Sequence, residues 1–211
     1  MTRVVPSTDA VECQGSVGRN ASGLHSTAMD AFFVETVDLL RRTPAVLRAL
    51  LLDAPDSWIS TPDTPDGWRP KDVVGHLITG EQTDWIARTK LILEEGPARP
   101  FERFNRFEML ERDVDASLDE LIERFAELRA ENLRRLGDLV RNDADLDRRG
   151  LHPSLGEVTL RELLATWSVH DLDHVSQIFA GMAGSRDADV GPWKAYLGIL
   201  LRREDPAAVA G

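Results

Sequence analysis

The apolar residues of this chain recur at intervals of three and four positions, the spacing that places them on one face of an α-helix. Turn-forming residues divide this pattern into four long segments and a shorter fifth one. The segments cover about residues 30–53, 70–95, 117–141, 159–183 and 192–204. None of them alternates apolar and polar residues as a half-buried strand does. The pattern therefore predicts an all-α fold, an up-down four-helix bundle with an extra C-terminal helix.

Local signals mark where several of these helices begin or bend. Pro70 occupies a favoured first-turn position of the second helix. Ser117 and Thr159 are each followed three residues later by glutamate, which is the spacing of a capping box at a helix N-terminus. Pro44 lies inside the first helix, where proline removes a backbone hydrogen bond. We therefore expect a kink or a short break just before Pro44.

The helical segments follow one another closely, so we expect a single domain over about residues 29–205. Residues 1–28 are rich in Gly, Ser, Thr and Val and lack any period, which predicts a disordered leader and makes Met29 a candidate natural start. Residues 97–116 form a long connection of the kind that is often functional, and we expect a short helix within it. Residues 142–157 are expected to form a polar loop.

Composition and charge narrow the class of protein. The formal net charge of −11 disfavours nucleic acid and anionic membranes as partners, because both usually bind a basic patch. No apolar run approaches the roughly 18 residues of a membrane span, and the N-terminus lacks a signal-peptide pattern. Cys13, the single cysteine, cannot form an internal disulfide, which agrees with a reducing compartment. We expect a cytoplasmic protein that binds a small-molecule substrate, and an exposed apolar face would support a homodimer.

The candidate chemistry lies in the fourth long segment, where His170 and His174 are four residues apart. Residues at i and i+4 share one helix face, and the rest of this face is largely apolar. Burial of an unpaired polar group costs roughly 1–3 kcal/mol, so both imidazoles need a partner there. A metal ion shared by the two rings would supply one. Hydrogen bonds within the core would supply another, and the pair alone leaves both interpretations open.

A third histidine, His76, lies in the second predicted helix and strengthens the metal interpretation. Facing helices of a bundle can hold one ion between them, and three neutral imidazoles with an open position suit Zn²⁺, Ni²⁺ or Fe²⁺. Asp171 and Asp173 flank the pair and could orient metal ligands, but we expect both to be exposed because adjacent positions face away. The His-Asp-x-x-His order lacks the glutamate base of zincins, and no strand pattern supports a protease.

Several other residues are candidates for a pocket beside the histidines. His152 lies in the loop before the fourth long helix and could contact a substrate or cofactor, although a loop histidine is more often plain surface. Trp85 and Trp167 could line the pocket, although aromatic residues at helical spacing usually belong to the core. Further candidates, for contacts behind the ligands, are Glu81, Gln82 and Gln177.

Three stretches that contain these histidines resemble motifs of the DinB-like superfamily. They are residues 68–77 (WRPKDVVGHL), 152–160 (HPSLGEVTL) and 159–178 (TLRELLATWSVHDLDHVSQI). The likeness extends over about residues 29–185 and leaves out only the leader and the final helix. The resemblance implies a four-helix bundle, often dimeric, in which three histidines hold a metal. The ligands that it implies for this chain are His76, His170 and His174.

What the resemblance implies for function is less specific. Relatives include thiol-dependent S-transferases that use bacillithiol or mycothiol, and a mycothiol-dependent maleylpyruvate isomerase. In such proteins the metal binds the cofactor thiol and lowers its pKa, so that a thiolate can attack an electrophile. The resemblance thus implies a metal-dependent thiol S-transferase with Zn²⁺, Ni²⁺ or Fe²⁺ and a low-molecular-weight thiol. The alternative is a non-enzymatic metal-binding bundle with a structural or stress-related role, and the sequence leaves catalysis itself undecided.

Overall fold

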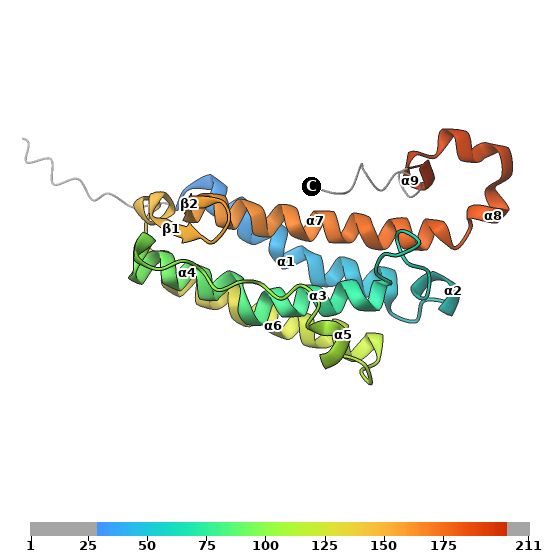
Figure 1. The fold of residues 1–211 in the computed structure, drawn as a ribbon, viewed down its shortest axis with the longest axis horizontal. Helices are drawn as coiled ribbons and strands as arrows, with labels where there is room; N and C mark the ends of the chain where they lie inside the picture. The colour runs from blue at the N-terminus through green and yellow to red at the C-terminus, as the bar shows by residue number, and fades with distance from the viewer. Residues whose placement is uncertain (1–28, 202–211) are drawn as a thin grey trace, which may run out of the picture.

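The computed structural model describes residues 29–201, which form a bundle of long helices that run side by side (Figure 1). The long helices are α1 (Ala31–Leu51), α3 (Pro70–Thr83) with its continuation α4 (Trp85–Glu94), α6 (Leu118–Leu139) and α7 (Leu160–Gly184). Both α6 and α7 pack against α1 and also against α3 and α4. This arrangement confirms the predicted all-α four-helix bundle.

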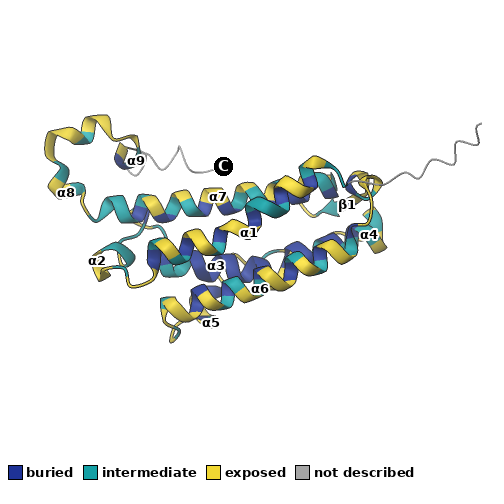
Figure 2. Cartoon of the chain, turned by 180° about the vertical axis from the view of Figure 1, so that it is seen from behind, coloured by how far each residue is buried: buried dark blue, intermediate teal, exposed yellow. Residues whose placement is uncertain are grey.

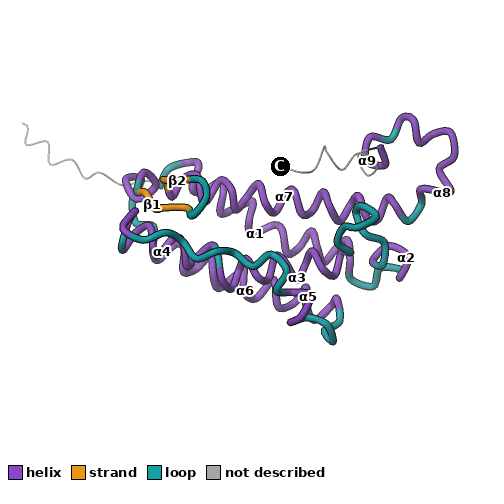
Figure 3. The backbone as a smooth tube through the Cα atoms, viewed as in Figure 1, coloured by secondary structure: helices purple, strands orange, loops and turns teal. Residues whose placement is uncertain are grey.

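Shorter elements form the connections between the long helices (Figure 3). An extended segment between η1 and α5 runs along α4 and α3 in that view. The shorter elements are α2 (Asp56–Ile59), η1 (Gly96–Ala98), α5 (Met109–Arg112), η2 (Asp143–Asp147), β1 (Arg149–His152), β2 (Gly156–Thr159), α8 (Asp187–Val190), η3 (Gly191–Tyr196) and α9 (Gly198–Leu201).

Both predicted capping boxes are present at the N-termini of α6 and α7. The Ser117 side chain accepts a hydrogen bond from the backbone N–H of Glu120, and the Glu120 carboxylate accepts one from the backbone N–H of Ser117. Thr159 and Glu162 form the same reciprocal pair at the start of α7. Each box satisfies two backbone donors that a helix N-terminus leaves free. The starts of these two helices were therefore predicted correctly.

The break predicted near Pro44 is absent, because α1 continues through the proline as one helix. Pro44 has no N–H to donate to the carbonyl of Leu40, four residues earlier. In the folded chain, Nη1 of Arg129 from α6 donates to that carbonyl instead, at 2.7 Å. The hydrogen bond that proline removes from α1 is thus replaced by one from a neighbouring helix.

The second predicted helix is interrupted once, at Asp84, which separates α3 from α4. The Asp84 side chain is buried and its carboxylate lies 2.7 Å from Nε of Arg88 in the next turn. Gly80 lets the Trp85 indole approach, because a Cβ on Gly80 would lie 2.8 Å from Nε1 of that ring. The interruption therefore coincides with a tight contact between a helix backbone and a large side chain.

Residues 142–157 are not the irregular polar loop that the sequence predicted. They contain η2 and most of an antiparallel hairpin, in which Arg149 pairs with Thr159 and His152 pairs with Gly156. Gly156 has a φ of 81°, a conformation that glycine adopts at a turn without steric cost. The strands are only four residues long each, which is barely enough to show an alternating pattern.

The prediction of one continuous helix over residues 192–204 is also wrong. Residues 187–201 hold three short elements, α8, η3 and α9, instead of one helix. Gly191 has a φ of 58° and precedes Pro192, and both features end a helix. The predictions for residues 202–205 and for the leader at residues 1–28 lie outside the described residues.

The apolar core consists of two clusters, one toward each end of the bundle, on the inward faces of the helices (Figure 2). The cluster near the hairpin includes Leu40, Trp85, Leu136 and Trp167. The other cluster includes Leu47, Ile78, Phe125 and Ile178. No helix within residues 29–201 is both long and apolar enough to cross a membrane. The outer face of α7 exposes Val169, Leu172 and Phe179, and the expected homodimer stays a prediction.

A buried polar layer separates the two apolar clusters and is centred on Arg129 of α6. The Arg129 side chain is 1% exposed, and its nitrogens lie 2.8 Å from Glu81 of α3 and 2.6 Å from Asp171 of α7. Asn132 donates to both the carbonyl and the carboxylate of Glu81, at 2.7 and 2.9 Å. Thr43 of α1 donates to Asp171 at 2.6 Å. Helices α1, α3, α6 and α7 thus all contribute side chains to one hydrogen-bonded network.

We predict that Arg129→Met destabilises the fold by about 3–5 kcal/mol, because it leaves two carboxylates buried without their cation. The measurement is the free energy of unfolding in urea. Arg124→Met on the same helix is the matched control: Arg124 is 41% exposed, so its loss should cost less than about 1 kcal/mol. Arg129→Lys, which keeps the charge, should lie between them. Similar small losses in Arg129→Met and Arg124→Met would contradict the central role of the network.

Candidate metal centre

The structure brings His76, His170 and His174 together between α3 and α7. Nε2 of His170 lies 3.2 Å from Nε2 of His76 and 3.1 Å from Nε2 of His174. One ring nitrogen from each of the three residues lies within 4.8 Å of the others. His76 comes from the first half of α3, and the other two come from successive turns of α7. The three imidazoles therefore face one point between two helices.

Hydrogen bonds hold the outer nitrogens of two of these rings. Nδ1 of His76 lies 3.2 Å from the backbone carbonyl of Arg106, and Nδ1 of His174 lies 2.8 Å from Oε1 of Gln177. The Gln177 amide is oriented in turn, because its Nε2 donates to Asp63 at 2.9 Å. Carbonyl oxygens only accept, so each Nδ1 carries the proton. Nε2 of both rings then keeps a lone pair that points into the cluster.

Nδ1 of His170 is buried and has no hydrogen-bond partner among residues 29–201. If Nε2 of His170 carries the ring proton, it can donate to only one of the two neighbouring lone pairs. If Nδ1 carries the proton, three lone pairs converge without any donor. In both cases the cluster contains unpaired polar atoms in a buried place, which costs free energy. A shared cation would satisfy all three lone pairs at once.

Burial keeps the three imidazoles neutral. It lowers the pKa of His76 to about 3, and repulsion from a charged His174 adds to the effect. It lowers the pKa of His170 to about 2, with further contributions from His174 and His76. Burial also lowers the pKa of His174. Metal ions bind the neutral form of imidazole, so protons do not compete for these nitrogens near neutral pH.

The spacing and chemistry of the donors fit a small divalent cation. Metal–nitrogen bonds of roughly 2.0–2.1 Å in tetrahedral geometry place ligand nitrogens about 3.3 Å apart, close to the 3.1 and 3.2 Å found here. Among the described residues, the cluster contains three histidines and no carboxylate or thiolate. Such a set suits Zn²⁺, Ni²⁺ or Fe²⁺ and keeps a position for a ligand from solution. The cluster supports a divalent metal, and the choice among these ions stays a prediction.

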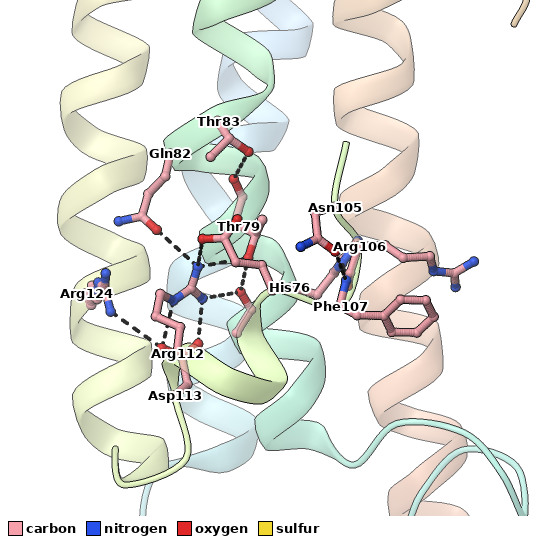
Figure 4. Close-up of polar contacts among 12 residues, drawn as sticks. His76, Thr79, Gln82, Thr83, Asn105, Arg106, Phe107, Arg112, Asp113 and Arg124 are labelled. Atoms are coloured by element: carbon pink, nitrogen blue, oxygen red, sulfur yellow. Dashed lines mark hydrogen bonds and ion pairs between the residues drawn. The ribbon is translucent and has the colours of Figure 1, made fainter. Parts of the chain in front are cut away.

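The extended segment at residues 99–108, which we call the strap, supplies the carbonyl that contacts His76. Arg112 anchors its far end to α3, where it donates to the carbonyl of Gly75 at 2.8 Å and to the hydroxyl of Thr79 at 2.9 Å (Figure 4). Gly75 is needed for this approach, because a Cβ there would lie 2.8 Å from the Asp113 carboxylate. The contact that fixes the His76 tautomer therefore depends on how α5 docks on α3.

A shallow, open groove of about 440 Å³ lies on the surface of α7, and His170 is the one member of the cluster that lines it. Its lining residues are Ala165, Thr166, Val169, His170 and Asp173. His170 is partly accessible there, whereas His76 and His174 are buried. Asp173 is the one charged residue in this lining. A small molecule on this face of α7 would therefore meet His170, and not the buried His76 or His174.

The two aspartates beside the ligands have different surroundings. Asp173 is exposed, as predicted, but the predicted exposure of Asp171 is wrong, because its side chain is 1% exposed and bonded to Arg129. Side chains at consecutive helix positions point about 100° apart. Because α7 packs against both α1 and α3, the side of α7 that carries Asp171 also faces the bundle interior, although it differs from the side that carries His170.

The remaining pocket candidates, Trp85, Trp167 and His152, do not lie together in the structure. Trp85 and Trp167 are buried and stack on each other, with ring centroids 5.4 Å apart. The Trp85 ring meets His170 edge-on at 5.2 Å, so this pair lies in the core beside the cluster. His152 ends β1, and its Nδ1 accepts a hydrogen bond from the backbone N–H of Ser154. None of the described contacts joins His152 to the three histidines.

Two groups that the sequence analysis missed are Arg129 and Asn132. Phe125, Arg129, Asn132 and Leu136 follow one another at steps of four, three and four residues, which is the spacing of a single helix face. Polar residues at two core positions of an apolar stripe were therefore a readable signal. Arg106, by contrast, acts on His76 through its backbone carbonyl, which any residue type would supply.

The model of the DinB superfamily matches residues 39–178 of this chain. The matched region includes His76, His170 and His174, and it takes in α3, α4 and α6 completely and most of α1 and α7.

Two relatives show similarity over most of the chain. A protein of Bacillus licheniformis, named as a candidate metal-dependent hydrolase, is 28% identical over 149 residues, or 67% of this chain and 80% of that protein. YfiT from Bacillus subtilis, described as a probable metal-dependent hydrolase with an unusual four-helix bundle topology, has a similar structure. The TM-score is 0.61 and the sequence identity 21%, with 85% of this chain and 93% of YfiT covered. At this identity the structural likeness concerns the fold.

We predict that the metal-free protein loses stability as the pH falls below about 6.5. The folded-state pKa values of all three histidines are lowered below the ordinary value of 6.5, so the unfolded chain binds more protons between that pH and the folded values. Each histidine would contribute at most about 1.4 kcal/mol per pH unit in this window. Urea unfolding of the metal-free chain at pH 7 and pH 5 measures the loss. In His170→Gln the free energy of unfolding should fall less between pH 7 and pH 5 than in the wild type. A decrease equal to that of the wild type would contradict the role of His170 in the pH dependence.

Proposed function

The chain belongs to the DinB superfamily, and from this premise we propose that it is a divalent-metal-dependent enzyme that transfers a low-molecular-weight thiol to an electrophilic small molecule. The observation that carries the proposal is the convergence of three neutral imidazole nitrogens with no fourth donor among the described residues. Closed structural zinc sites almost always have four protein ligands. A three-ligand set keeps a position for a ligand from solution, which is the feature of a catalytic site.

A divalent cation held by the three nitrogens would lower the pKa of a thiol at its open position, so that a thiolate forms near neutral pH. The chain's own residues prepare the donors for this. The Arg106 carbonyl and the Gln177 amide fix the tautomers of His76 and His174. The α7 groove, where His170 is partly exposed, would be the approach for the thiol and its electrophile.

Neither buried carboxylate of the Arg129 network can act as a base for hydrolysis, which agrees with a thiol as the nucleophile. Hydrolysis usually needs a general base that takes a proton from water. Glu81 and Asp171 are both buried and bonded to Arg129, so neither is free to act as that base. A thiol has an ordinary pKa of about 8.5, and a moderate lowering of this value is enough to ionise it without a protein base.

Hydrolysis is the second candidate, because both relatives are described as metal-dependent hydrolases. Asp173 is exposed and lines the same groove as His170. It is therefore the carboxylate that would take a proton from water in that reaction. Replacement of Asp173 by asparagine distinguishes the two candidates, since only hydrolysis would need its negative charge.

We predict that His174→Ala loses most of the bound metal, because two imidazoles hold a cation much more weakly than three. His152→Ala is the matched control, since His152 has no described contact with the cluster, and it should keep the wild-type content of about one ion per chain. Elemental analysis after purification without added chelator measures both. Equal metal in His174→Ala and wild type would contradict the site.

The same proteins test the reaction. Metal-loaded wild type and His152→Ala should accelerate the coupling of a low-molecular-weight thiol to a halogenated nitroarene, and His174→Ala should not. Asp173→Asn should keep this activity within about threefold, whereas it would lower hydrolysis of a model ester by about 100-fold or more if Asp173 is a base. Full metal content without coupling of any of several thiols would contradict the transferase and favour a non-enzymatic metal-binding bundle.

A further inference from the structure

The strap places one arginine side chain, that of Arg106, between two aromatic rings beside the three histidines. Its guanidinium carbon lies 5.2 Å from the ring centroid of Trp68 and 5.3 Å from that of Phe107. The two rings meet edge-on, with their centroids 6.1 Å apart. Figure 4 shows the Arg106 and Phe107 side chains extending from the strap toward α7. The aromatic faces thus hold an exposed cation in a defined place.

This cation lies at the edge of the metal centre. The Trp68 ring that supports it is 4.7 Å from the His76 ring and stacks on the His174 ring at 6.2 Å. The positive charge of Arg106 is close enough to contribute to the lowered pKa of His76 and of His174, in both cases after burial, the largest cause. A molecule that is bound at the centre and extends over the Trp68 ring would therefore meet the guanidinium.

The Arg106 guanidinium has no carboxylate partner in the part of the chain that the structure describes. Within residues 29–201 it forms no ion pair and no side-chain hydrogen bond, whereas the neighbouring Arg112 is paired with Asp113. The chain contains 36 acidic and 25 basic residues, so carboxylates are plentiful in general. Asp173, which lines the nearby groove, forms no ion pair with Arg106 either. All five N–H donors of this guanidinium are thus available to a ligand.

We propose that Arg106 binds an anionic group of the substrate, most simply a carboxylate, while Trp68 and Phe107 contact an apolar part of the same molecule. The guanidinium fork matches a carboxylate with two parallel hydrogen bonds. Contact with the two rings restricts the arginine before binding, so less conformational entropy is lost when the ligand binds. The proposal names the substrate class of the enzyme proposed above and rests on that function.

The test compares two probes that differ in charge, benzoate and benzamide, on the zinc-loaded full-length chain. Binding is followed by tryptophan fluorescence, because Trp68 lies at the site. Wild type should prefer benzoate, and Arg106→Gln should weaken benzoate binding at least about tenfold, the usual effect of losing a charge-assisted pair. Benzamide binding should change less than about twofold. Arg103→Gln is the matched control, because Arg103 is exposed on the same strap and has no described ring contact, and it should bind both probes like wild type.

Three outcomes would overturn the proposal. Unchanged benzoate binding in Arg106→Gln would mean that the carboxylate binds elsewhere, for example directly to the metal. An equal loss of benzoate affinity in Arg103→Gln would mean that the overall positive charge of the strap, and not a specific contact with Arg106, attracts the anion. Wild type without preference for benzoate would exclude an anion site. All of these readouts measure binding and not catalysis. A failed thiol-coupling assay would therefore reject the proposed reaction without affecting the conclusion about the anion site.

Discussion

The five N–H donors of the buried Arg129 guanidinium are all satisfied, by the Leu40 carbonyl in α1, by Glu81 in α3 and by Asp171 in α7. A helix that slid along its neighbours would leave a charge unpaired in the interior, which costs several kcal/mol. The network therefore fixes the axial register of the bundle. His170 is adjacent to Asp171, and His76 precedes Glu81 by five residues, so the same register brings the metal ligands opposite one another.

Charges around the cluster have two opposing effects. Burial is the main cause of the lowered pKa of His170 and His174 and keeps their ring lone pairs free of protons, and the cationic neighbours Arg129 at His170 and Arg106 at His174 add a smaller lowering. The same positive charges would repel a metal cation. Glu81 and Asp171 counter the charge of Arg129 inside the bundle, whereas no side chain counters Arg106 within the described residues. The uncompensated charge thus lies on the exposed strap, against the Trp68 and Phe107 rings.

Much of the fold and part of the site could be predicted from the sequence. The capping boxes at Ser117 and Thr159 involve residues three positions apart, and the pairing of His170 with His174 on one helix face follows from helix geometry alone. The short β-hairpin and the divided C-terminal helix were missed. Both depend on glycines with positive φ, at Gly156 and Gly191, whose backbone conformation the residue type permits but does not require.

The sequence by itself determined the four long helical segments of the bundle, the capping boxes that start two of them, and the identity of three histidines able to share an ion. Only the tertiary structure decided that α1 continues unbroken through Pro44, that Asp171 is buried, and that a strap carbonyl orients His76. Each of these depends on a partner far along the chain: Arg129 is 89 residues from Leu40, Asp171 is 128 from Thr43, and Arg106 is 30 from His76. Local propensities act over a few residues, so contacts of this range follow from helix packing alone.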